Sequence, residues 1–278
     1  MTLTINKITN LLRNNGFDVL AVTTGFLEKS IEQPMIIFDH RSYPGVEAHV
    51  VTAANSALWI PKLDDNGDVF VYYPYSTNNE EHLFAWERLL GVLDKLAGLL
   101  HTYRNRVLAG HLPGIIWAHH EIEWYRGLRR APYHEQQNPS NFIDYVDPSI
   151  RNHIIDLNEY GFDTVESCSG LLQDHPDRDP YRPYVMLDER AYPNCIPHFF
   201  TLAEIADWIP SYAPHNFDVY IRIQHHDNIR EAWNRLVQSA RNLHTLLKPY
   251  RQLVKSTSSC IDELDTLLDS PSTALVKR

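Results

Sequence analysis

The residues best suited to chemistry lie in one turn, Ser167-Cys168-Ser169-Gly170, and in the polar segment that follows it. Four small residues let a ligand approach the backbone closely, and they offer hydroxyls, a thiol and several N–H groups in one place. Cys168 is the strongest single candidate, since a thiol becomes a nucleophile when a positive neighbour or a base favours the thiolate. His175 and Arg182 follow closely enough to act on it. Because no cysteine-protease signature surrounds Cys168, the favoured role is to shape a binding turn, and covalent catalysis is the alternative.

Two other polar segments could contribute to the same site. The segment from Asp174 to Asp179 contains Asp and His, which bind metals, but it lacks the Gly and terminal Glu of an EF-hand. We therefore interpret it as a solvated loop that can close over the turn, and we assign no metal ligand to the site. His225-His226-Asp227 stands where a strand ends and a helix begins, which is a common place for ligand groups. His175 or His225 would then handle a proton.

A separate metal hypothesis rests on His119, His120 and Glu123. On a helix, His119 and Glu123 lie one turn apart on one face, and so do His120 and Glu123, which would give two ligands. A third ligand is not visible in the sequence, and the favoured interpretation is a polar helix face. The sequence contains no Gly-x-Gly-x-x-Gly and no Walker loop, so nucleotide binding has no motif support.

The elements that must position the turn can be predicted from the residues around it. Ile150, Ile154 and Leu157 recur at helical spacing, and we expect Asp147 to cap this helix. Gly161 fits just past the helix end, and residues 162–166 then favour a short strand. We expect further strands at 184–187 and 217–223, and a short helix at 202–208. A helix from Asn228 should break or restart at Pro249.

The block from Asn158 to Gly170, with Thr164 and the Ser-Cys-Ser-Gly turn, resembles the signature of the wybutosine-synthesising tRNA methyltransferase family. Members of that family methylate a tricyclic guanosine next to a tRNA anticodon, and their block has a helix, a strand and a Ser-Ser-Cys-Ser-Gly-Arg turn in this order. The resemblance covers about residues 147–247. Glu166 stands in place of the first Ser of that turn, and Leu171 in place of its Arg.

The resemblance implies an S-adenosylmethionine-dependent methyltransferase that acts on RNA or another nucleobase. Catalysis would consist mostly of positioning a methyl donor against a nucleophilic nitrogen. The alternatives are a non-enzymatic protein that binds a small molecule, and a metal-dependent hydrolase that uses the His-rich segments. The predicted catalytic residues are Cys168, His175 and His225. The predicted substrate- or cofactor-binding residues are Ser167, Ser169, Gly170, Arg182, Tyr184 and His226.

The first half of the chain predicts a sheet covered by helices. A helix at 3–15 precedes strand candidates at 17–23, 35–38, 47–52, 57–60 and 69–73, and the turn at 64–68 predicts a hairpin. Leu83 to Leu100 repeats at helical spacing and should lie across the sheet. We predict an α+β fold, with an antiparallel N-terminal sheet, a C-terminal mixed α/β unit and a terminal helix. The predicted divisions are residues 1–131, a linker at 132–146, a domain at 147–247 and a helix with a tail at 248–278.

Composition restricts the function classes. The chain has 278 residues, 44% of them hydrophobic, and a net charge of -10, which argues against a broad nucleic-acid surface. Three Cys without a Cys-x-x-Cys pair favour a reduced compartment, and the sequence shows no internal repeat and no membrane-spanning stretch. We therefore expect a cytoplasmic protein whose partners are a small molecule or RNA. The last amphipathic helix either packs on this chain or pairs with a second copy to form a homodimer.

Overall fold

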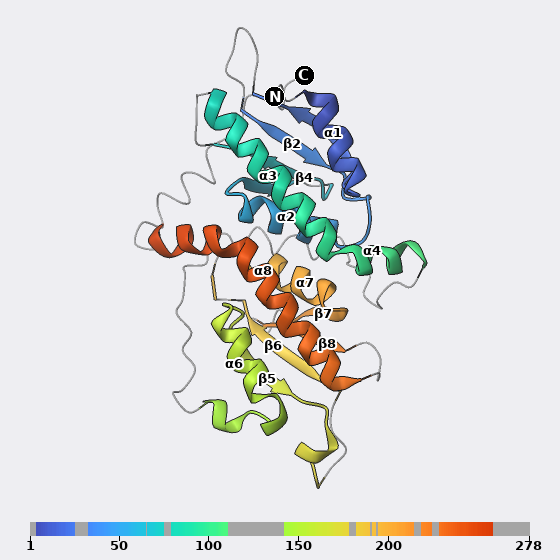
Figure 1. Ribbon diagram of the computed structural model, residues 1–278, viewed down its shortest axis with the longest axis vertical. Coiled ribbons are helices and arrows are strands. Elements are labelled where there is room, and N and C mark those ends of the chain that lie inside the picture. Colours follow the sequence, from blue (N-terminus) through green and yellow to red (C-terminus); the bar gives the residue numbers. More distant parts are fainter. Residues whose placement is uncertain are drawn as a thin grey trace.

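The structure is a computed structural model that describes residues 4–25, 33–64, 66–74, 79–110, 142–177, 182–189, 191–192, 194–213, 218–223 and 228–257. Two halves lie end to end, each with helices packed on one antiparallel sheet (Figure 1). The prediction of an α+β fold with a helix-covered N-terminal sheet is confirmed, and the second sheet is antiparallel as well. None of the helices in these ranges combines the length and apolarity needed to cross a bilayer.

The first half is a four-stranded sheet with strand order β1-β2-β4-β3. Buried Ile8 and Leu12 hold α1 against the sheet, and the buried Trp86 and Leu93 do the same for α3. The elements of this half are α1 (Ile5–Asn14), β1 (Val19–Thr23), β2 (Met35–Phe38), α2 (Val46–Ser56), β3 (Ile60–Leu63), β4 (Val69–Tyr72), α3 (Asn79–Leu99) and α4 (His101–Leu108).

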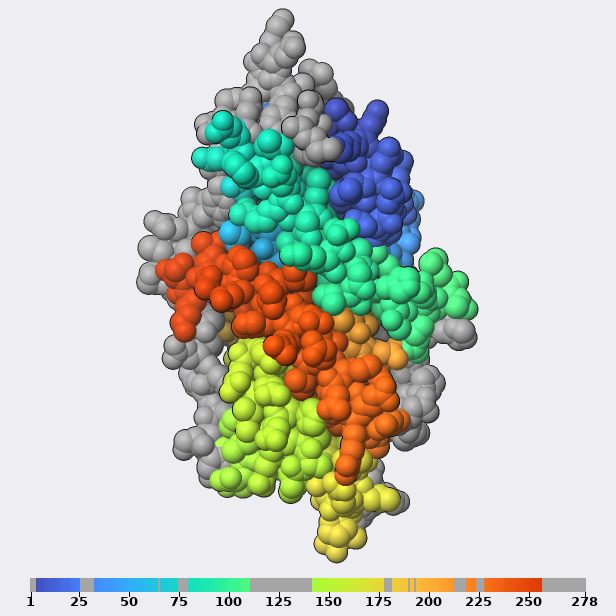
Figure 2. All heavy atoms as spheres, viewed as in Figure 1, coloured from blue at the N-terminus to red at the C-terminus, as the bar shows by residue number. Residues whose placement is uncertain are grey.

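The second half has the strand order β5-β6-β8-β7. Figure 2 shows α8 lying between α6 on one side and the first half on the other. The elements are η2 (Phe142–Tyr145), η3 (Pro148–Ile150), α6 (Arg151–Glu159), β5 (Thr164–Cys168), η4 (Leu172–Asp174), β6 (Tyr184–Asp188), α7 (Cys195–Ile205), β7 (Trp208–Ala213), β8 (Asp218–Ile223) and α8 (Ile229–Thr257).

The two halves are repeats of one another, so the expectation of no internal repeat is wrong. Each runs helix, strand, strand, helix, strand, strand, helix, with α3 and α4 together corresponding to α8, and the strand orders correspond one to one. Positive φ angles also recur at equivalent places, at Gly45 and Asn194 and again at Leu58 and Asp207. Equivalent positions carry the same residue at Gly16 and Gly161, Phe17 and Phe162, Asp18 and Asp163, Tyr43 and Tyr192, His49 and His198, Thr52 and Thr201, Trp59 and Trp208, Trp86 and Trp233, Tyr103 and Tyr250, and Arg104 and Arg251.

The repeats meet where α2 packs on α7, and a buried polar network joins them there. Thr52 Oγ1 lies 2.8 Å from Thr201 Oγ1, and both side chains are fully buried. His49 Nε2 contacts the Glu204 carboxylate of the other repeat. The reciprocal contact joins Asn55 Nδ2 to His198 Nε2 at 3.0 Å. The two repeats are therefore related by an approximate twofold axis through the threonine pair.

An arginine clamp recurs in each repeat. Arg104 donates to the Asn15 carbonyl and, at 2.8 Å, to the Tyr43 hydroxyl, and its guanidinium lies over the Phe17 and Tyr43 rings. Arg251 makes the equivalent contacts in the second repeat, with the Tyr160 carbonyl, the Tyr192 hydroxyl, and the Phe162 and Tyr192 rings. The clamp ties the last helix of each repeat to the turn that follows the first helix.

Three sequence predictions are corrected by the fold. Residues 47–52 belong to α2 rather than to a strand, because a short helix that is buried on every side lacks amphipathic spacing and resembles a buried strand. Strand β7, beginning at Trp208, lies where the predicted short helix at 202–208 ends, and α7 begins earlier. Finally, α8 continues through Pro249, an exposed position between the buried Leu247 and Tyr250, whose packing keeps the helix intact.

Glu47 makes the stability of this core dependent on pH. Burial, opposed in part by its own backbone N–H and by His40, raises the pKa of Glu47 from 4.5 to about 7. The folded protein therefore holds a proton that the unfolded chain has lost between pH 4.5 and about 7, and the free energy of unfolding falls as the pH rises through this window. The equivalent residue of the second repeat, Ile196, carries no charge.

We predict that Glu47→Gln removes this fall and raises the free energy of unfolding at pH 8 by about 3 kcal/mol. Denaturant titrations of both proteins from pH 4 to pH 8 measure it. Glu87→Gln, on an exposed position of α3, is the matched control and should leave the pH profile unchanged. Parallel pH profiles for wild type and Glu47→Gln would contradict the prediction.

Candidate functional site

Three side chains of the types that bind metals meet at the end of β5: a thiol, an imidazole and a carboxylate. Cys168 Sγ lies 3.3 Å from Nε2 of His175, and the same nitrogen lies 3.2 Å from Oδ2 of Asp147. The three atoms all lie within 4.8 Å of one another. Cys168 is 4% exposed and His175 is 9% exposed, so water competes weakly for these groups. The predicted proximity of Cys168 and His175 is confirmed.

The turn after Cys168 is held by hydrogen bonds to Ser169. Its N–H donates to Oδ2 of Asp147 at 2.7 Å, its carbonyl accepts from Trp233 Nε1 at 3.2 Å, and its Oγ accepts from the Leu171 N–H at 3.1 Å. Ser169 is fully buried, so its polar groups stabilise the turn through these hydrogen bonds and do not face solvent. Asp147 makes no side-chain cap bond to η3, and its carboxylate faces the cluster instead.

The first repeat contains the same turn without the thiol. Trp86 Nε1 donates to the Thr24 carbonyl at 3.1 Å, as Trp233 does to the carbonyl of Ser169. Thr23-Thr24-Gly25 thus stands where the second repeat has Cys168-Ser169-Gly170. Because the turn forms without a cysteine, its shape is a property of the fold, and the thiol distinguishes the second repeat.

An aromatic pair borders the cluster on the face of the sheet that points away from the core. The Tyr184 and Tyr220 rings stack with their centroids 4.8 Å apart and an interplanar angle of 24°. The Tyr184 hydroxyl donates to the Glu166 carboxylate. Burial, followed by this hydrogen bond, raises the pKa of Tyr184, so its hydroxyl stays protonated near neutral pH. The neighbouring residues Val185 and Ile221 alternate with the tyrosines and point into the core.

The other predicted site residues are placed as follows. Ser167 is partly exposed on β5, and Arg182 is exposed before β6. Gly170 has a φ of 71° and packs on Pro183. The remaining predictions fall outside the described part of the chain: His225, His226, His119, His120 and Glu123. Sequence reasoning missed Asp147 as a site residue, since an Asp before Pro at a helix start is typical of a cap.

A second group of ligand-type atoms occurs in the first repeat, at Asp39, His40 and Asp68. His40 Nδ1 lies 2.8 Å from Oδ1 of Asp68. The Arg41 side chain donates two hydrogen bonds to Asp39 at 2.8 and 2.9 Å, and its backbone N–H donates a third at 2.9 Å. Chiefly through the side-chain bonds, the pKa of Asp39 falls to about 2. Because the arginine already compensates one carboxylate, this group needs no cation, and we do not assign a site to it.

No protein-family model, curated protein or solved structure matches this chain. The resemblance to the wybutosine methyltransferase block therefore stays a prediction. Within that block, the Thr164 N–H donates to Oδ1 of Asn158 at 2.8 Å, and Asn158 Nδ2 donates to Thr164 Oγ1 at 3.0 Å. Two of the residues that carry the resemblance thus join α6 to β5.

The geometry of the turn predicts opposite effects for two Gly→Ala substitutions. At Gly170, with its φ of 71°, a Cβ atom would lie 2.3 Å from Pro183 Cγ and 2.9 Å from its backbone nitrogen. Gly170→Ala should therefore destabilise the protein by about 2–4 kcal/mol. Gly98→Ala, in α3 where a Cβ meets no atom within 4 Å, should stabilise it by about 0.5–1 kcal/mol. Thermal or denaturant melts measure both, and equal effects would show that the turn tolerates a side chain.

Proposed function

We propose that this protein is a zinc-dependent enzyme of the hydrolase class, in which Asp147, Cys168 and His175 hold the metal. One observation carries the proposal: three donor atoms from separate segments converge within 4.8 Å. Thiolate, imidazole and carboxylate are the ligands that Zn²⁺ takes in proteins. Three protein ligands also leave one tetrahedral position for a water molecule, the arrangement of catalytic rather than structural zinc sites.

Hydrogen bonding alone accounts for the cluster less well than a cation does. Sγ of Cys168 and Oδ2 of Asp147 face the same ring nitrogen of His175. One ring nitrogen offers a single proton or a single lone pair, so it makes at most one strong hydrogen bond. A central cation accepts a lone pair from each of the three atoms.

The distances also suit zinc. Tetrahedral zinc with Zn–S near 2.3 Å and Zn–N and Zn–O near 2.0–2.1 Å separates sulfur from nitrogen by about 3.5 Å and nitrogen from oxygen by about 3.3 Å. The distances in this cluster are 3.3 Å and 3.2 Å. The N–H of Ser169 orients the Asp147 carboxylate through a hydrogen bond, which is the support that metal ligands commonly receive.

The groups around the cluster can bind a substrate next to the metal. The stacked Tyr184 and Tyr220 offer an aromatic surface, and Glu166 and Arg222 supply charges of both signs on the same face. A water molecule bound to catalytic zinc has its pKa lowered to about 7, which provides hydroxide at neutral pH. A planar or aromatic substrate with a hydrolysable bond fits these surroundings.

The proposal predicts one zinc ion per chain in the purified protein, measured by elemental analysis. Cys168→Ala and His175→Ala should each abolish stoichiometric zinc, because two ligands rarely retain the ion. Cys195→Ala is the matched control: Cys195 is equally buried, but its thiol donates to the Glu189 carbonyl at 2.8 Å, outside the cluster. This variant should keep its zinc.

The absorption spectrum of the cobalt-loaded protein tests the site even if a variant fails to fold. Wild-type protein loaded with Co²⁺ should show a thiolate-to-cobalt charge-transfer band, and Cys195→Ala should show it unchanged. Metal-free wild-type protein that binds neither Zn²⁺ nor Co²⁺, or zinc that persists in folded Cys168→Ala, would refute the site. Hydrolysis of a panel of ester, amide and amidine substrates, lost on chelation and restored by Zn²⁺, tests the reaction class.

The resemblance predicts a different ligand, S-adenosylmethionine. Calorimetry of the metal-free protein separates the two hypotheses, because a methyl donor needs no zinc. Saturable binding of S-adenosylmethionine that survives chelation and Cys168→Ala would favour methyl transfer over hydrolysis. Zinc binding without any response to S-adenosylmethionine is the outcome that we expect.

A further inference from the structure

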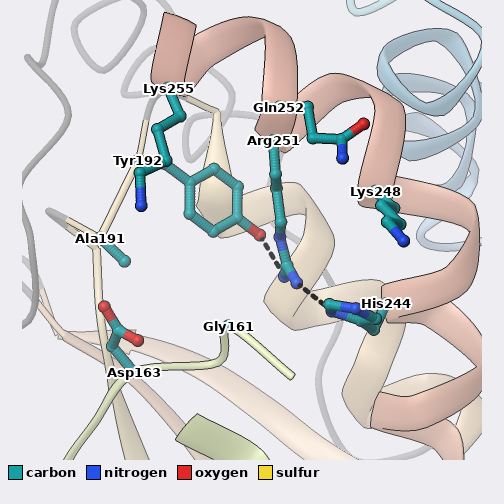
Figure 3. Close-up of a pocket in the computed structure, with 9 residues that line it drawn as sticks. All are labelled: Gly161, Asp163, Ala191, Tyr192, His244, Lys248, Arg251, Gln252 and Lys255. Carbon is teal, nitrogen blue, oxygen red and sulfur yellow. Dashed lines mark hydrogen bonds between the residues drawn. The ribbon is translucent and has the colours of Figure 1, made fainter. Parts of the chain in front are cut away.

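A pocket of about 290 Å³ opens at the other end of the second repeat, where α8 passes the turn between α6 and β5. Four basic side chains line it from one face of α8: His244, Lys248, Arg251 and Lys255. Their spacing of four, three and four residues places them along one stripe of the helix. Figure 3 shows Lys248 and Lys255 on either side of Arg251, with the Asp163 carboxyl on the opposite wall.

The first repeat shows which basic residues of the pocket the fold itself requires. The arginine clamp is common to both repeats, so Arg251 has a structural role. The positions of His244, Lys248 and Lys255 correspond to Ala97, His101 and Leu108. The same architecture thus forms without this set of basic groups, and their presence in the second repeat needs another explanation.

The lining of the pocket contains more cationic groups than carboxyl groups. The contacts described for the Arg251 guanidinium are to a carbonyl, a hydroxyl, Nδ1 of His244 at 3.3 Å and aromatic rings, and none of these is a carboxylate. The one carboxyl of the lining, Asp163, has its pKa raised by burial to about 6, against the lowering effect of Arg251. The lining of this pocket therefore contains three cationic side chains and one carboxyl, in a protein whose net charge is -10.

We infer that this pocket binds the phosphate group of a small phosphorylated molecule. Lys248 and Lys255 supply ammonium donors on two sides, and His244 presents its ring from the same helix face. The pocket volume accommodates a phosphate together with a compact organic group. The site is separate from the metal cluster, because Asp163 directly precedes β5 whereas Cys168 ends it. The inference does not depend on the proposed hydrolase activity.

Calorimetric titration of the full chain with inorganic phosphate and with phenyl phosphate tests the inference. Wild type should bind both, with the monoester the tighter. Lys248→Gln combined with Lys255→Gln should weaken binding by about tenfold or more, because two charged donors are lost. Both lysines are exposed, so the thermal midpoint of the double variant should stay close to that of wild type.

Two controls tie the binding to this pocket. His101→Gln alters the position equivalent to Lys248 in the first repeat and should leave phosphate affinity unchanged. Cys168→Ala should also leave it unchanged, which separates this pocket from phosphate bound at a metal. Undetectable binding to wild type, or equal affinity in the folded double variant, would overturn the inference. Tighter binding of a single-stranded RNA oligonucleotide than of phenyl phosphate would overturn the assignment to a small molecule.

Discussion

The hydrogen bond between Thr52 and Thr201 lies where the two repeats meet, and the rest of the structure depends on the contact around it. Helices α2 and α7 are buried along nearly their whole length, yet both carry polar side chains. A buried polar group without a partner costs about 1–3 kcal/mol, so each helix needs the other to satisfy these side chains. His49 finds the Glu204 carboxylate, and Asn55 finds His198. A single repeat would lose these partners and expose a helix that is otherwise buried, so we expect the two halves to fold as one cooperative unit.

Residues that both repeats share differ in role from residues that only one repeat contains. Residues that recur in both repeats, such as the Trp59–Trp86 and Trp208–Trp233 pairs with ring centroids 4.9 and 5.0 Å apart, build the fold. The Ser169–Gly170 turn belongs to this class, because Thr24-Gly25 forms it as well. Groups found in one repeat alone, such as Cys168 or Lys248, are not required by the architecture.

The sequence predicted those elements whose local pattern and tertiary environment agree. Strand β2 has its predicted bounds, and Gly161 takes the predicted left-handed conformation after α6. Burial on every side erased the pattern that would have identified α2, and packing of α8 overrode the helix-breaking tendency of Pro249. The Cys168–His175 contact was predictable because only a short loop separates the two residues. Asp147 was not, because its approach depends on the path of α6, and the same Asp-Pro pair is typical of a helix cap.

The α2–α7 contact restricts where the two proposed sites can lie. Matching surfaces of α2 and α7 must be kept in both repeats, since a change in one leaves a buried polar group in the other unpaired. The ends of β5 lie outside the α2–α7 contact, so substitutions there leave its buried hydrogen bonds in place. The metal cluster and the basic pocket occupy these two ends, separated by a strand of five residues, about 16 Å. A compact ligand cannot span that distance, so a molecule that engages both sites must be extended along β5. The first repeat, with Thr23 and Leu108 at the corresponding places, then serves as the scaffold that completes the core of the second.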